Sequence, residues 1–154
     1  MAQPIPLSRN AGAARARHAK AMLLPIARQI ADDLALRVHL ALDALRLGAG
    51  SKTDAQTLTQ TMLLSGFLAE SSFGSVSGDE LGAADRAISA VFDIGRTTGE
   101  WRLDGAEFAL FASIATGYDR LLHSAPLWAI TEASDRLDRF IAGVPDRAPV
   151  RKRA

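Results

Sequence analysis

The chain contains no cysteine among its 154 residues. This absence excludes disulfide bonds, cysteine-ligated zinc, iron–sulfur clusters and thiol catalysis. Aromatic residues make up only 6% of the chain, and β-branched residues are too scattered to indicate a strand. No apolar run approaches the roughly 18–20 residues that cross a bilayer. We therefore expect a cytoplasmic protein that makes no contact with a membrane.

Patterns that carry chemistry are also missing from the sequence. The three histidines, His18, His39 and His123, have no partner histidine at the helical spacing of a metal site. Residues 48–53 resemble a phosphate-binding loop in part, but Ser51 interrupts the Gly-Lys-Thr string and a helix precedes the segment instead of a strand. A helix end followed by a helix cap explains the same residues. We predict a non-enzymatic protein with no catalytic residue, cofactor or metal, and an enzyme whose site is assembled in space is the least favoured alternative.

What the chain does contain is a high share of helix-forming residues. Apolar residues make up 48% of the sequence, which is typical of a globular domain. Most of them are Ala and Leu, which favour helices. They recur every three or four residues, the period of an amphipathic helix. The sequence predicts an all-α fold, a compact bundle or orthogonal packing of about five helices with disordered basic termini. The expected helices cover residues 25–47, 52–72, 77–99, 104–125 and 124–143.

Local signals mark where these helices begin. Ser51 with Asp54 (or Thr53 with Gln56) and Ser77 with Glu80 have the spacing of a capping box. Asp104 is followed by Glu107 at the same spacing, which predicts a side-chain cap there. Three glycines inside the expected helices each cost roughly 1 kcal/mol relative to alanine, so we expect close helix–helix approach at Gly66, Gly95 and Gly117.

The first expected helix, residues 25–47, is the most apolar. One face carries Ile26, Ile30, Leu34, Val38, Ala41 and Leu45 at steps of three or four residues. Three further leucines, Leu36, Leu40 and Leu47, widen this stripe. The pattern predicts that the helix lies at the centre of the fold.

Charge divides the chain into three parts. Residues 1–30 hold five basic and no acidic residues, whereas the middle of the chain is mildly acidic. We predict a basic, largely disordered N-terminal arm at 1–24, a helical domain at 25–143 and a basic C-terminal tail at 144–154. A solvated arm is preferred over an organelle-targeting segment.

Two kinds of partner are compatible with these features. Trp101 and Trp128 occur near predicted helix starts, where each is either a core side chain or an exposed anchor for a protein partner. The basic termini can instead contact nucleic-acid phosphates without reading sequence. The residues expected to do so are Arg9, Arg15, Arg17, Lys20, Arg151, Lys152 and Arg153. The favoured function is a protein-interaction or regulatory module with an unknown protein partner, and a homo-oligomer is left open.

Two segments of the chain carry a resemblance to known sequences. Residues 38–48 (Val-His-Leu-Ala-Leu-Asp-Ala-Leu-Arg-Leu-Gly) and 97–107 (Thr-Thr-Gly-Glu-Trp-Arg-Leu-Asp-Gly-Ala-Glu) resemble a loose group of small all-helical bacterial proteins of accessory and mobile DNA. Some of these proteins are labelled Fis-family regulators. The resemblance implies a bacterial accessory protein and assigns no functional residue.

Overall fold

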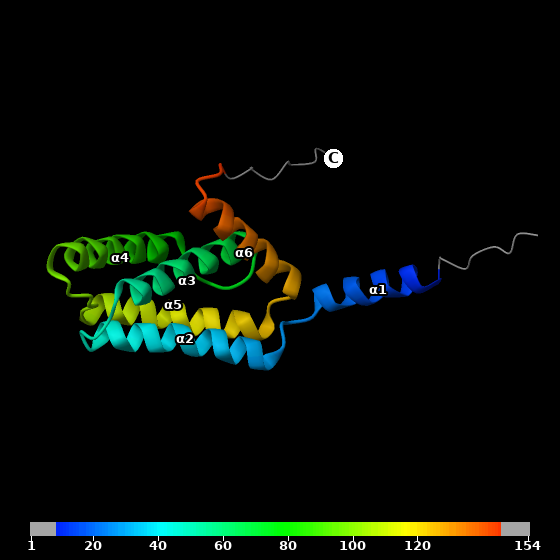
Figure 1. Cartoon of the computed structure of the whole chain (residues 1–154), viewed down its shortest axis with the longest axis horizontal. Helices are drawn as coiled ribbons and strands as arrows, with labels where there is room; N and C mark the ends of the chain where they lie inside the picture. The colour runs from blue at the N-terminus through cyan, green and yellow to red at the C-terminus, as the bar shows by residue number, and fades with distance from the viewer. Residues whose placement is uncertain (1–8, 146–154) are drawn as a thin grey trace, which may run out of the picture.

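The computed structural model describes residues 9–145, which form six α-helices and no strand (Figure 1). The all-α prediction is confirmed. The helices are α1 (Arg9–Leu23), α2 (Arg28–Arg46), α3 (Lys52–Glu70), α4 (Gly78–Thr98), α5 (Gly105–Ser124) and α6 (Leu127–Ile141). The additional helix is α1, which lies within the arm that was predicted to be largely disordered. Its alanines explain the difference, because Ala has the highest intrinsic helix propensity.

Helices α2 to α5 form an up-and-down bundle along the long axis of the molecule (Figure 1). Successive helices are antiparallel, as short connections require. Helix α6 crosses one end of this bundle and packs on α3, so α3 touches each of α2, α4, α5 and α6. The central helix is therefore α3.

The position of α2 differs from the prediction. Val38, Ala41 and Leu45 are buried as expected, but Leu36, Leu40 and Leu47 are between 56% and 66% exposed. The helix is an outer helix with an apolar solvent face. Its high apolar content could not distinguish this arrangement from a central position.

The helix starts follow the local signals closely. Ser51 and Asp54 form a reciprocal capping box at α3, and Ser77 and Glu80 form another at α4, both as predicted. At α5 the N-cap is Asp104, as predicted, but its side chain makes no cap hydrogen bond. Its carboxylate instead pairs with the guanidinium of Arg102 at 3.3 Å. A nearby cation has competed with the helix end for this carboxylate.

Close packing explains two of the three interior glycines. A Cβ added to Gly66 would lie 3.1 Å from Leu81, and one added to Gly95 would overlap the indole of Trp101. At Gly117 an added Cβ would meet no atom within 4 Å. The prediction of close approach is therefore confirmed for Gly66 and Gly95 and wrong for Gly117.

Candidate functional site

Helix α1 projects from the end of the bundle into solvent (Figure 1). Residues 11–21 are all exposed, and the neighbour of α1 in the fold is α6. The helix has 15 residues, a length at which an isolated helix is marginal in water even when rich in Ala. Tertiary packing normally supplies the missing stability. Among the described residues, such packing on α1 comes from α6, at one end of the helix.

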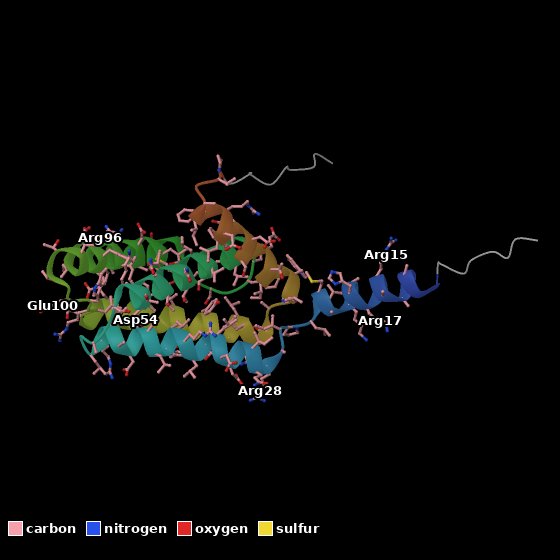
Figure 2. All side chains as sticks on the ribbon, in the orientation of Figure 1. Arg15, Arg17, Arg28, Asp54, Arg96 and Glu100 are labelled. Carbon is pink, nitrogen blue, oxygen red and sulfur yellow. The ribbon has the colours of Figure 1, made fainter. Side chains whose placement is uncertain are left out.

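The charge of α1 has one sign. Its described side chains include Arg15, Arg17 and Lys20 and no acidic residue. Figure 2 shows the side chains of Arg15 and Arg17 pointing to opposite sides of the helix. A surface that approaches α1 from either side therefore meets a cation. Arg9 begins the helix, but its side chain, like Arg151, Lys152 and Arg153, lies outside the described residues.

The C-terminal end of α1 is apolar and is attached to the bundle by backbone contacts. The N–H of Leu127 donates to the carbonyl of Leu24 at 2.8 Å, and Pro25 pairs with Pro126 in an isolated bridge. Around this junction Leu23 is 69% exposed and Leu24 53% exposed. A short segment with backbone contacts to the start of α6 therefore attaches the basic helix to the bundle, and two exposed leucines lie at this attachment.

Trp128 lies one residue beyond this junction, in the first turn of α6. It is 37% exposed, and its ring meets the ring of Phe73 edge to face at 5.6 Å. A large aromatic side chain that packs on the fold and still reaches solvent is typical of an interface anchor. Trp128 follows Leu127, whose N–H bonds to Leu24, so its backbone lies close to the end of α1. We call Leu23, Leu24, Trp128 and the described side chains of α1 the α1 surface.

Trp101 has a different environment. Its indole covers the backbone of Gly95, meets the Phe92 ring edge to face at 5.5 Å and packs against the main core cluster. This arrangement favours the core alternative for Trp101. The structure does not bring the two tryptophans together, because Trp101 precedes the start of the 20-residue helix α5 and Trp128 follows its end.

A polar network joins α2 to α5. The Nε2 of His123 lies 2.7 Å from Oδ1 of Asp32, and its Nδ1 lies 2.8 Å from the backbone carbonyl oxygen of Asp119. His39 Nε2 is 3.6 Å from the Asp119 carboxylate. The hydrogen bond to the Asp119 carbonyl, followed by the one to Asp32, raises the pKa of His123. Within residues 9–145, no group of His, Asp and Glu side chains has the arrangement of a metal site.

The remaining features support the simpler interpretation of the sequence. Residues 48–53 cap α3 through Ser51, as described above, which accounts for the partial likeness to a phosphate-binding loop. No helix in the described part of the chain is long and apolar enough to cross a membrane.

Comparison with known proteins adds no relative to this picture. No family model matches the chain, and no curated protein or solved structure is significantly similar to it.

Sequence reasoning missed two features of the surface. It identified the basic residues near the N-terminus but not that they project on a helix, because exposure of an Ala-rich segment leaves no periodic signal. It also missed a polar cavity beside α5, described below. The signal available for that cavity was Gly117, a glycine inside a helix.

Proposed function

We propose that the protein is a non-enzymatic interaction module that binds an acidic surface of another protein through the α1 surface. The accessory character implied by the resemblance, and the lack of cysteine, fit a role in the bacterial cytoplasm. The single observation that carries the proposal is that α1 projects as a helix with residues 11–21 all exposed.

Helix α1 needs a packing partner to be stable. A 15-residue helix without packing gains little from its own hydrogen bonds, because nucleation is costly. A partner that packs along α1 supplies the missing apolar contact and orders the helix. Recognition of a short helix in a groove is a common mode of protein binding.

The charge of α1 favours an acidic partner. With Arg15, Arg17 and Lys20 on different sides and no acid on the helix, α1 complements an acidic groove. Electrostatic attraction of this kind raises the association rate, whereas apolar contacts set the lifetime of the complex.

Exposed apolar side chains near α1 favour a protein partner over nucleic acid. Non-specific binding of phosphates through cations requires no apolar side chains. The α1 surface also presents Leu23, Leu24 and Trp128 around the C-terminal end of the helix. Exposed leucine and tryptophan side chains can fill apolar pockets on the surface of a protein partner.

The experiment begins with the full chain in cells. A photo-crosslinking amino acid is placed at Ala14 or His18 on α1, and at the exposed Ser89 on α4 as a matched control. The proposal predicts a protein adduct of defined mass from both α1 positions and none from Ser89. Identical adducts from all three positions, or none from α1, would contradict it.

The crosslinked protein is then purified and titrated against the full chain. Reversing the α1 charges with Arg15→Glu, Arg17→Glu and Lys20→Glu should weaken binding at least tenfold, since Glu preserves helix propensity. The matched control reverses three exposed cations elsewhere, Arg37, Lys52 and Arg86, and should leave the affinity within about twofold.

Two other occupants of α1 are outcomes of the same series. Labelled duplex DNA that binds the full chain, with an affinity that falls steeply with salt, would replace the protein partner by nucleic acid. A self-adduct in the crosslinking experiment, with a dimer in sedimentation, would assign α1 to a second copy of this chain. Either result overturns the proposal.

A further inference from the structure

A cavity of about 290 Å³ lies between α3, α5 and the segment that joins α3 to α4. This volume is close to the lower end of the range for small-molecule sites, roughly 300–1,000 Å³. Five hydroxyl groups line it, from Ser65, Ser75, Ser113, Tyr118 and Ser124. None of the residues that line it belongs to the α1 surface, so this cavity is independent of the proposed function.

The hydroxyl of Ser65 is the first indication of a ligand. The side chain is 3% exposed, and its Oγ has no hydrogen-bond partner among the described residues. One turn earlier, the hydroxyl of Thr61 donates to the carbonyl of Thr57 at 2.9 Å, which is the usual solution for a helical hydroxyl. A buried hydroxyl left without a partner is unfavourable, so a polar atom in the cavity would satisfy Ser65.

Gly117 is the second indication. It lies inside α5, and an added Cβ would meet no atom within 4 Å although the residue lines the cavity. Alanine would favour the helix and would fit, so neither packing nor backbone conformation explains the glycine. Its effect is to keep the cavity open next to Tyr118, whose burial raises the pKa of the hydroxyl.

Two opposite charges complete the lining. Among the cavity residues, Glu80 and Arg120 are charged, and they form no ion pair with each other. One carboxylate oxygen of Glu80 accepts the N–H of Ser77 at 2.8 Å, which leaves its other oxygen for a ligand. A molecule that carries both charges would be matched by both groups.

We propose that this cavity binds a small zwitterion of the free amino acid class. Its carboxylate pairs with Arg120, its ammonium group with Glu80, and a polar side-chain atom reaches the hydroxyl of Ser65. A neutral sugar would use the hydroxyls but neither charge, and inorganic phosphate would be repelled by Glu80.

The test uses the purified full chain and calorimetric titration with each protein amino acid separately. D-ribose and inorganic phosphate serve as the neutral and anionic probes. One or a few polar amino acids should bind saturably, and neither probe should. The proposal is overturned if no amino acid binds at about 10 mM, or if ribose or phosphate binds more tightly.

Variants place the ligand in the cavity. Gly117→Leu fills the space and should abolish binding, whereas Gly82→Leu on α4 is the matched control and should retain it, because its nearest neighbour is the flexible end of Arg86. Unchanged affinity in a folded Gly117→Leu chain overturns the proposal.

Smaller substitutions keep the test valid if Gly117→Leu does not fold. Ser65→Ala should weaken binding about tenfold without lowering the melting temperature, since the hydroxyl has no partner in the free protein. Glu80→Gln, which preserves the cap acceptor, and Arg120→Gln should each weaken it about tenfold or more. Equal affinity in all three variants would show that the amino acid binds elsewhere.

Discussion

The backbone of Gly95 on α4 lies directly beneath the indole of Trp101, so closely that a side chain on Gly95 would occupy the space of the ring. Gly95 is buried, and the ring is held from another side by Phe92. This contact attaches the segment between α4 and α5 to the core.

The contact predicts that Gly95→Ala changes the free energy of unfolding in opposite directions with and without the Trp101 ring. Gly95→Ala alone should destabilise the protein by about 1–3 kcal/mol, because the methyl group forces the indole out of place. In a Trp101→Ala background the same change should be neutral or stabilising by up to about 1 kcal/mol, since only helix propensity remains. Urea unfolding measures both values. Equal effects in the two backgrounds would show that the two residues do not interact.

The two tryptophans should separate stability from binding. Trp101→Ala should lower the free energy of unfolding by about 3 kcal/mol, as for other large aromatic residues in a core. Trp128→Ala should cost less, about 2 kcal/mol, because the residue is 37% exposed. The same Trp128→Ala chain should lose affinity for the crosslinked partner. Retained affinity at wild-type level would remove Trp128 from the α1 surface.

His123 predicts a dependence of stability on pH. Its pKa is raised in the folded protein from the ordinary value of 6.5, by hydrogen bonds to the Asp119 carbonyl and to Asp32. The charged bridge therefore stabilises the fold fully below the unfolded pKa, and this contribution is lost as the pH rises through the folded pKa. Arg28 and His39 also face these carboxylates, at 3.9 Å from Asp32 and 3.6 Å from Asp119.

The measurement is the melting temperature from about pH 5.5 to pH 8.5, a range that brackets the ordinary histidine pKa. The wild-type chain should lose more stability across this range than His123→Gln. His18→Gln is the matched control on α1, where the side chain is exposed, and should follow the wild-type curve. Parallel curves for wild type and His123→Gln would mean that the bridge is not formed in solution.

The interior glycines give a further stability prediction. Gly117→Ala should stabilise the free protein by about 1 kcal/mol, since the methyl group enters open space and the helix gains propensity. Gly66→Ala should gain less or lose stability, because its Cβ would approach Leu81 to 3.1 Å. Thermal unfolding compares the two. A destabilised Gly117→Ala chain would contradict the open space at that position.

What the sequence could predict depended on how local the cause is. The capping boxes at Ser51 and Ser77 involve residues three apart, so their prediction needed no tertiary information. The solvent face of α2 could not be predicted, because Leu40 has the same periodicity whether a neighbouring helix covers it or not. The cap at Asp104 was lost to Arg102, a competition that depends on side-chain geometry.

The candidate sites were harder to predict for the same reason. The sequence identified Arg15, Arg17 and Lys20 by charge, but their projection from the bundle depends on which of the described elements pack on α1. The cavity brings Ser65 and Gly117 together from different helices, and the segment between α3 and α4 closes it. The spacing of residues along the sequence does not predict that two side chains from different helices line one cavity.

The most direct test of the central proposal is amide hydrogen exchange of residues 11–21 in the full chain. Exchange should be rapid in the free protein, because no described residue covers α1 there, and should slow by more than about tenfold when the crosslinked partner is added. Residues of α3 should be strongly protected in both states. Strong protection of α1 in the free monomer, or no gain on adding the partner, would contradict the claim that α1 is the binding element.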